Sequence, residues 1–307
     1  MLRNNTAGDP MNQNVIWTNL TEEEIVKKLA IEGVKTSRTV VRKLFRKYGY
    51  KKRKAMKVKT LKEDKDRNEQ FKNIANLRTE FEKSNNPIIS IDTKKKEFLG
   101  NFYREGKLMT KEVIKVYDHD FNSFAKGIII PHGIYDLKEN TGYINIGTSR
   151  DTGEFACDCI QQWWKAEGKK RYSKATEILI LCDGGGSNSA RHYLFKLDLM
   201  KLASKLGIKI RIAHYPPYTS KYNPIEHRLF SYLTKACQGV IFKTIEVVKK
   251  LFANTSTKTG LSVKVNVIDK IYKTGRLVTK KFKRTIKENS KIQFHDILPK
   301  FNYSVLA

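Results

Sequence analysis

The order of hydrophobic periodicities after residue 85 is the strongest constraint on the fold of this chain. Short apolar runs bounded by turn residues predict strands, and apolar residues spaced three or four apart predict helices. Strands are expected at 87–92, 95–103, 127–136 and 141–149, followed by a helix at 151–168, a strand at 175–183, a helix at 189–207, a strand at 208–216 and a helix at 223–239. This region therefore begins with a run of strands and only then alternates helices with strands.

This element order predicts an α/β fold in which a mixed sheet is flanked by helices, the RNase H-like arrangement. A doubly wound nucleotide-binding fold would instead alternate strands and helices from its first strand. The glycine-rich stretch at 184–188 also matches neither the GxGxxG nor the GxxxxGK[ST] phosphate-binding pattern. We therefore expect an RNase H-like domain over residues 85–307, which includes a basic C-terminal extension.

Two short helices are expected near the N-terminus. Thr21 followed by Glu24 has the spacing of a capping box, and Gly33 is a natural end for the helix that starts there. Ser37 can cap a second helix, which ends before Gly49. Apolar residues recur along this second helix at helical spacing, at Val40, Val41, Leu44, Phe45 and Tyr48.

The other face of this second helix is basic. It carries Arg38, Thr39, Arg42, Lys43 and Arg46. Two helices joined by a short turn, the second of them basic, are typical of a helix-turn-helix unit that places such side chains in the major groove of DNA. A helical hairpin with a solvated basic face gives the same pattern, so that alternative stays open.

The segment after these helices predicts an arm and a connection. Residues 51–59 hold six basic residues and no acid, which indicates phosphate contacts from Lys51, Lys52, Arg53 and Lys54. A connecting helix is expected within 61–84 because of the spacing of Phe71, Ile74, Leu77 and Phe81. The chain is thereby divided into a helix-turn-helix segment with its arm at 1–60, a connecting helix at 61–84 and the RNase H-like domain at 85–307.

Charge and composition indicate the partner and the compartment. The chain carries 60 Lys and Arg against 31 Asp and Glu, a formal net charge of +29, which favours a polyanionic partner such as double-stranded DNA. A generally solvated basic surface would also account for this charge. We expect a soluble, cytoplasmic, nucleoid-associated protein with no membrane partner and no structural zinc, because the chain lacks a long apolar run, a secretory signal and a CxxC pair.

Three carboxylates are candidates for a catalytic cluster. Asp92 and Asp183 each end an expected buried strand, where open α/β sheets keep their sites. If those strands are neighbours, the two carboxylates repel each other unless a cation lies between them. Glu226, near the start of the last expected helix, can complete the set. Three carboxylates and one scissile phosphate balance the charge of two Mg²⁺ ions.

Two of these acids also fit purely local roles. Asp183 is followed by three glycines, a sequence common in turns. Asn223 followed by Pro224 is a good helix start, with Asn223 as the cap and Glu226 as a capping-box acid. Trp163 and Trp164 are expected to pack in the core rather than to stack on bases.

Several segments together resemble a known family. They are IDTKKKEFLGNF, IPHGIYD, GTSRDTGEFA, ILILCDGGGSN, HYPPYTSKYNPIEHRLFS and ANTSTKTGL, in that order. They resemble the DDE transposases of bacterial insertion sequences, in particular the Rhodopirellula-type (ISAzo-type) group within the mariner-like superfamily. The resemblance runs from about Gly8 to the FNYSV stretch near the C-terminus, and YPPYTSKYNPIE is its most specific segment. In GTSRDT, Arg150 departs from the family, where histidine is usual.

The resemblance implies an RNase H-like catalytic domain with two Mg²⁺ ions, which Mn²⁺ can replace. Matched by motif, the catalytic and metal-binding acids fall on Asp92, Asp183 and Glu226. The implied activity is DNA cleavage at insertion-sequence ends and strand transfer into target DNA, by a homo-oligomer bound to DNA, with Lys94 and Lys221 as candidate phosphate contacts. The N-terminal recognition region is expected to be shortened. The alternatives are an inactive DNA-binding remnant acting as a repressor, or an RNase H-like nuclease.

Overall fold

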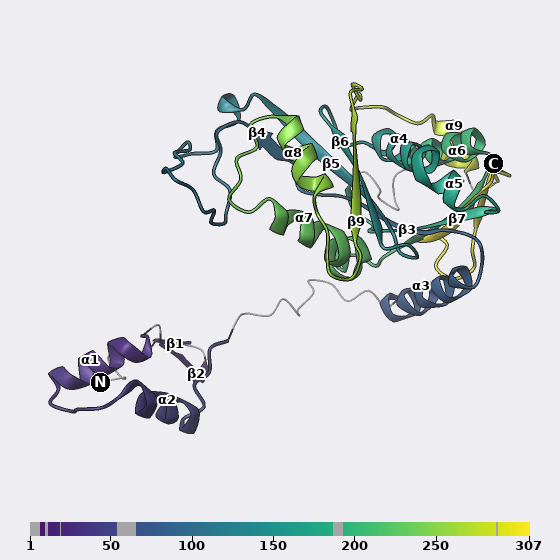
Figure 1. Ribbon diagram of the computed structural model, residues 1–307. Coiled ribbons are helices and arrows are strands. Elements are labelled where there is room, and N and C mark those ends of the chain that lie inside the picture. The colour runs from purple at the N-terminus through teal and green to yellow at the C-terminus, as the bar shows by residue number, and fades with distance from the viewer. Residues whose placement is uncertain (1–6, 10–11, 19, 54–65, 187–192, 287) are drawn as a thin grey trace. The chain divides into compact units, whose positions relative to one another are not determined.

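The computed structural model describes residues 7–9, 12–18, 20–53, 66–186, 193–286 and 288–307. The chain divides into two compact units, Met1–Leu61 and Lys62–Ala307 (Figure 1). In the parts of the chain that the structure describes, we find no helix with the length and apolar character needed to cross a membrane.

The smaller unit contains a two-stranded antiparallel sheet and two helices. They are β1 (Ala7–Asp9), β2 (Asn12–Trp17), α1 (Glu22–Ile31) and α2 (Arg38–Lys47). The predicted capping box is confirmed, since Thr21 Oγ1 accepts from Glu24 N at 3.3 Å and Glu24 Oε2 accepts from Thr21 N at 2.7 Å. Ser37 caps α2, as predicted, by accepting from the amide of Val40. The strands β1 and β2 were not among the expected elements.

The apolar residues of α2 are only partly covered. Val41 is buried, and Phe45 is partly buried beside Tyr50, with 5.5 Å between their ring centroids. Val40, Leu44 and Tyr48 are exposed. The two helices are joined at their surface by an ion pair, in which the Arg42 guanidinium donates to both carboxylate oxygens of Glu22, at 3.0 and 2.8 Å.

The larger unit is built on a nine-stranded sheet. Its order is β10–β11–β8–β7–β3–β5–β6–β9, with β4 paired to β5. The strands are β3 (Ile88–Thr93), β4 (Glu97–Leu99), β5 (Gly127–Asp136), β6 (Thr141–Gly147), β7 (Glu177–Cys182), β8 (Lys209–His214), β9 (Ser262–Ile268), β10 (Ile292–Phe294) and β11 (Asn302–Val305).

The centre of this sheet has RNase H-like topology. Strand β5 runs antiparallel to β3 and β6, whereas β3, β7 and β8 are parallel. Across the sheet, the five central strands are arranged β6–β5–β3–β7–β8. Numbered by their order in the chain, with β4 left out, they are the third, second, first, fourth and fifth strands. The predicted RNase H-like fold, a mixed sheet flanked by helices, is confirmed. The expected strand at 95–103 shortens to β4, and the C-terminal part of the chain adds β9, β10 and β11 at the two edges.

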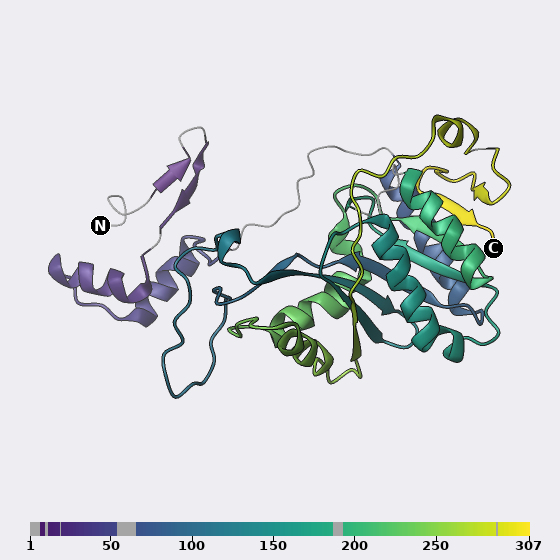
Figure 2. The same ribbon diagram turned by 90° about the horizontal axis from the view of Figure 1, so that it is seen from above.

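Helices cover both faces of the sheet (Figures 1 and 2). They are α3 (Arg67–Glu82), α4 (Gly153–Trp163), α5 (Lys169–Arg171), α6 (Tyr193–Leu206), α7 (Ser231–Ala236), α8 (Ile245–Ala253) and α9 (Lys280–Thr285), with π-helical turns η3 (Trp164–Gly168) and η6 (Glu226–Phe230) and 3₁₀ turns η2 (Asn122–Phe124) and η5 (Ser220–Tyr222). Helices α4 and α6 pack on one face in a core that contains Trp163 and Trp164, as expected. Helix α3 and the η6–α7–α8 segment pack on the other.

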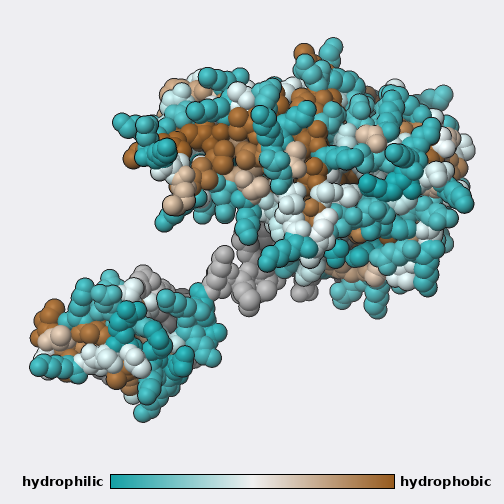
Figure 3. Space-filling model, viewed as in Figure 1, coloured by the Kyte–Doolittle hydropathy of each residue, from teal (hydrophilic) through white to brown (hydrophobic). Residues whose placement is uncertain are grey.

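The segment 100–126 between β4 and β5 differs from the rest of the larger unit. It contains only one short helical turn, η2, among its described residues. It exposes apolar side chains at Tyr103, Leu108, Met109, Val113, Ile114, Tyr117, Phe121 and Phe124. Hydrophobic surface gathers where β4 and α8 lie (Figure 3). This end of the unit is therefore much less polar than a typical solvated loop.

A buried polar cluster attaches α3 to the sheet. Asn302 on β11 exchanges hydrogen bonds with Gln70, at 2.6 and 3.1 Å, and accepts a third from Asn73 at 2.8 Å. Gln70 also donates to the backbone oxygen of His214 at 2.7 Å. Gln70 and Asn302 are fully buried. These bonds give α3 a defined position, because a buried amide without partners is strongly disfavoured.

We predict that Asn302→Ala lowers the free energy of unfolding by about 1–3 kcal/mol, because it removes partners from two buried amides. Chemical denaturation followed by circular dichroism measures the loss. The exposed Asn254 offers a control, and Asn254→Ala should change stability by less than about 0.5 kcal/mol. Equal effects of the two substitutions would contradict the role given to Asn302.

Candidate active site

Two of the candidate acids lie at the carboxyl ends of neighbouring strands. Strands β3 and β7 are parallel partners, and their register pairs Ile91 with Cys182. Asp92 and Asp183 are the next residues along each chain segment. The two carboxylates therefore emerge side by side at one end of the sheet, and both are partly buried. The sequence-based condition that these two strands be neighbours is met.

The third candidate, Glu226, is the first residue of η6. This helix approaches β5 closely because Gly133, the register partner of Asp92, has no side chain. A Cβ at Gly133 would lie 2.6 Å from Phe230 Cε1 and 2.9 Å from Ile225 Cδ1, well inside van der Waals contact. Glycine in this strand therefore permits the helix carrying Glu226 to pack against the end of β3 that carries Asp92.

Burial, with a smaller contribution from neighbouring charges, disfavours the ionised forms of the three acids. Burial, followed by the charge of Asp183, raises the pKa of Asp92 from 3.8 to about 8. Burial also raises the pKa of Glu226 and of Asp183. The contact between the Asp92 and Glu226 side chains adds to the rise in the pKa of Asp92 and lowers the pKa of Glu226.

The donor set suits a hard divalent cation, because all three groups are carboxylates and their mutual repulsion would be relieved by positive charge. Within the described residues, however, no three His, Cys, Asp or Glu side chains are gathered closely enough to hold a metal ion. Binding of one cation by all three acids therefore requires their side chains to move closer together.

A polar chain next to Asp92 was not anticipated from the sequence. The hydroxyl of Thr93, the residue after Asp92, donates to Asp151 Oδ1 at 3.2 Å and lies 3.0 Å from Nδ1 of His132. His132 is fully buried on β5, and burial lowers its pKa to about 4. The charge of Asp151 in turn raises the pKa of Asp183. One signal was available in the sequence, namely a histidine within an otherwise apolar strand.

The backbone around Asp183 is supported from β8 and β11. Nδ1 of the buried His214 lies 3.1 Å from the Asp183 carbonyl oxygen, and Nε2 lies 3.2 Å from the hydroxyl of Tyr303. Burial lowers the pKa of His214 to about 4, so it is neutral at physiological pH. The amide of Gly185 donates to Asp183 Oδ1 at 3.3 Å, so the expected turn chemistry accompanies the strand-end position.

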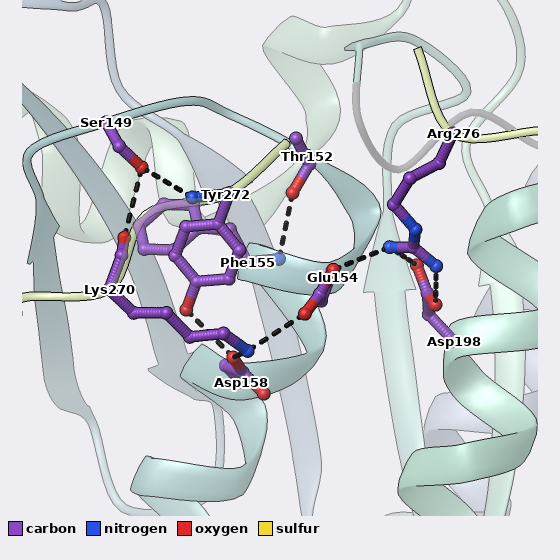
Figure 4. A network of polar contacts seen from close by, with 9 residues as sticks. All are labelled: Ser149, Thr152, Glu154, Phe155, Asp158, Asp198, Lys270, Tyr272 and Arg276. Atoms are coloured by element: carbon purple, nitrogen blue, oxygen red, sulfur yellow. Dashed lines mark hydrogen bonds and ion pairs between the residues drawn. The ribbon is translucent and has the colours of Figure 1, made fainter. Parts of the chain in front are cut away.

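The loop that carries Asp151 is held by the segment after β9 (Figure 4). Ser149 Oγ donates to the Lys270 carbonyl at 3.1 Å and accepts from the Tyr272 amide at 3.0 Å. Lys270 Nζ then pairs with Glu154 and Asp158 on α4, and Arg276 bridges Glu154 to Asp198 on α6. A pocket of ≈ 270 Å³ lies beside this network and includes none of the three candidate acids in its lining.

The candidate DNA contacts have different surroundings. Lys94 is 13% exposed and donates to Glu97 at 3.1 Å, whereas Lys221 is exposed and stacks over Tyr222. Arg42 is tied to Glu22. The other predicted contacts that the structure describes are exposed, at Arg38, Thr39, Lys43, Arg46, Lys51, Lys52 and Arg53. Lys54 lies outside the described residues, as do Ser187 and Asn188 of the glycine-rich stretch.

The larger unit is therefore an RNase H-like domain with one acid near the end of β3 and a second directly after the neighbouring strand β7. The chain belongs to the Rhodopirellula transposase DDE domain family, whose model matches residues 1–307. A comparison with curated proteins gives no match.

A comparison with solved structures finds matches to Mos1 transposase. The Mos1 transposase paired-end complex with left transposon end is 18% identical, with 75% of this chain and 65% of that chain covered and a TM-score of 0.45. The mariner Mos1 paired end complex with Mg is 15% identical at the same coverage and TM-score. The catalytic domain of Mos1 mariner transposase is 14% identical, with 62% and 80% covered and a TM-score of 0.41.

We predict that Asp92→Asn raises the melting temperature without divalent cations at pH 8–9 and leaves it unchanged near pH 3. Because the folded pKa of about 8 lies above the ordinary 3.8, folding takes up a proton, and the stability that Asp92 provides at low pH is lost as the pH rises through about 8. Each kilocalorie regained corresponds to about 2–4 °C. Differential scanning calorimetry measures the shift.

The control for this measurement is Asp118→Asn, which removes a carboxylate whose side chain is 87% exposed. It should leave the melting temperature nearly constant at both pH values. A gain for Asp92→Asn that is the same at low and high pH would show that the substitution acts through packing rather than through charge.

Proposed function

We propose that this protein cleaves DNA strands at insertion-sequence ends and joins them to target DNA by metal-dependent, in-line phosphoryl transfer. The observation that carries the proposal is the position of Asp92 and Asp183 at the same end of the neighbouring parallel strands β3 and β7, in a chain of a DDE transposase family. The contact of Asp92 with Glu226, which contributes to the raised pKa of Asp92, supports the inclusion of the helix acid.

In this mechanism Asp92 and Asp183 hold divalent cations at the sheet end, and Glu226 completes the ligand set from the helix. When bound, two Mg²⁺ ions, or Mn²⁺ in their place, lower the pKa of the attacking water and stabilise the departing 3′ oxygen. The three carboxylates offset the ionic charge together with the scissile phosphate. A cation would bind the ionised form of Asp92, so the burial that raises the pKa of Asp92 to about 8 would make cation binding sensitive to pH.

We propose that the smaller unit binds the DNA ends as a helix-turn-helix. Arg38, Thr39, Lys43 and Arg46 are exposed on α2, and the formal net charge of +29 supplies attraction to phosphate at any sequence. Arg42 would have to exchange Glu22 for a DNA contact. Cutting and joining two element ends together calls for a homo-oligomer of this chain on the DNA, which in a bacterial cell places it at the nucleoid.

We predict that Asp92→Asn, Asp183→Asn and Glu226→Gln each abolish Mg²⁺-dependent cleavage of DNA that carries the terminal repeats flanking the gene. Each substitution removes a ligand charge and no phosphate contact, so DNA affinity should stay within about threefold. Gel assays of cleavage and strand transfer measure the first effect, and fluorescence anisotropy measures the second.

Asp118→Asn serves as the matched control and should retain cleavage, because the Asp118 side chain is exposed. Full activity in any of the three site variants would remove that residue from the set. Cleavage without joining would favour a nuclease, and binding without cleavage by the unaltered chain would favour a repressor.

If α2 lies in the major groove, we predict that Arg46→Ala weakens binding to terminal-repeat DNA by about 1–3 kcal/mol. Binding to scrambled DNA should weaken much less. Replacing Lys51, Lys52 and Arg53 with alanine should weaken both DNAs alike and flatten the salt dependence by up to about one slope unit per lost phosphate contact. Titrations at two salt concentrations measure both effects.

The Arg42–Glu22 pair provides a further control within the same unit. Glu22→Gln frees Arg42 while leaving the basic face intact, so it should maintain or strengthen DNA binding. Weaker binding by Glu22→Gln than by the unaltered chain, with the fold retained, would show that Arg42 acts structurally. If Arg46→Ala weakened the binding of both DNAs equally, the proposed role of α2 as a recognition helix would be contradicted.

A further inference from the structure

Two buried polar residues link the strand of Asp92 to the helix of Glu226. Ser90 lies in the middle of β3 between Ile89 and Ile91, and Asn223 lies just before η6. Both side chains are 0% exposed. Burying a hydroxyl and an amide among apolar side chains is unfavourable unless each finds partners, so their contacts explain why they are tolerated here.

The two side chains satisfy each other and the adjoining backbone. Ser90 Oγ donates to Asn223 Oδ1 and accepts from the amide of Ile225 at 3.2 Å. Asn223 Nδ2 donates to the carbonyl oxygen of Ile91 at 3.3 Å. Ile91 directly precedes Asp92, and Ile225 directly precedes Glu226. The bonds to backbone therefore end one residue away from each of these acids.

This arrangement corrects the sequence-based interpretation of Asn223 as an ordinary helix cap. The Asn223 side chain bonds to β3 instead, because its Oδ1 accepts from Ser90 and its Nδ2 donates to the carbonyl oxygen of Ile91. The hydroxyl of Ser90 accepts an amide hydrogen at the start of the helix, so the strand itself supplies the cap. The helix start cannot slide along β3 without leaving buried polar groups unpaired, which is strongly unfavourable.

We propose that Ser90 and Asn223 act as positioning residues, a buried latch that sets the distance between Asp92 and Glu226 for cation binding. This inference rests on the proposed metal-dependent function. Neither side chain touches the reacting atoms. Both act through the backbone that carries a ligand, as hydrogen-bond partners behind metal ligands do, and loss of such partners typically weakens metal affinity about 10- to 100-fold.

Mn²⁺ binding to the full chain, measured by electron paramagnetic resonance without DNA, tests the latch separately from catalysis. Ser90→Ala and Asn223→Ala should each raise the Kd for Mn²⁺ by about 10- to 100-fold. The double substitution should weaken binding by less than the product of the two single effects, because both substitutions break the shared bond between Ser90 and Asn223. Ser90→Thr keeps the hydroxyl and should remain within about threefold of the unaltered chain.

Asn302→Ala is the matched control, because it also removes buried amide bonds but joins α3 to β11 and touches neither β3 nor η6. It should lower the melting temperature and leave the Kd for Mn²⁺ unchanged. Thermal unfolding of every variant confirms that the fold is retained at the temperature of the titration.

The outcomes separate the latch from the proposed function. If the unaltered chain binds Mn²⁺ and the latch variants bind it more weakly, the positioning role of the latch is supported even when no DNA is cleaved. In that case only the proposed transposase activity is rejected. Equal Mn²⁺ affinity of folded latch variants and unaltered chain overturns the latch, whatever the cleavage assay shows. Ser90→Thr binding as weakly as Ser90→Ala, or no Mn²⁺ binding by the unaltered chain, also overturns it.

Discussion

The parallel pairing of β3 with β7 is the constraint on which the rest of the larger unit depends. Because these strands are neighbours and run in the same direction, Asp92 near the end of β3 and Asp183 directly after β7 lie at the same edge of the sheet. The pairing also explains the covering layers, since both strands are buried on both faces. Their alternate residues pack against α4 and α6 on one side and against α3 on the other.

By bringing two carboxylates together, that pairing lowers the stability of the folded protein. Asp92 and Asp183 are brought together at a partly buried edge, and burial followed by the charge of Asp183 raises the pKa of Asp92 to about 8. A fold that only had to be stable would separate these groups or pair each with a basic residue. The apolar core under them tolerates the arrangement, which is typical of sites where stability is given up for chemistry.

Much of this framework could be predicted from the chain alone, because strands such as β3 and β7 carry strong local signals and end in acids. Contacts between distant segments could not, and Asn223 shows why a local signal can mislead. An asparagine before a proline at a helix start has the sequence of a cap, whether its side chain turns to its own helix or to a distant strand. The burial of Ser90 decides between the two, because it offers a hydroxyl in an otherwise apolar layer, and Ser90 lies 133 residues earlier in the chain.

Glu226 differs from the two aspartates in the part of the fold that holds it in position. Asp92 and Asp183 are fixed by backbone pairing within one sheet, which changes little with side-chain composition. Glu226 is carried by a helix whose distance from the sheet is set by side chains, namely the missing Cβ of Gly133 and the hydroxyl of Ser90. Small changes in packing therefore move the helix acid first, and because the contact with Glu226 adds to the raised pKa of Asp92, such a movement also alters the balance between the neutral and ionised forms of Asp92.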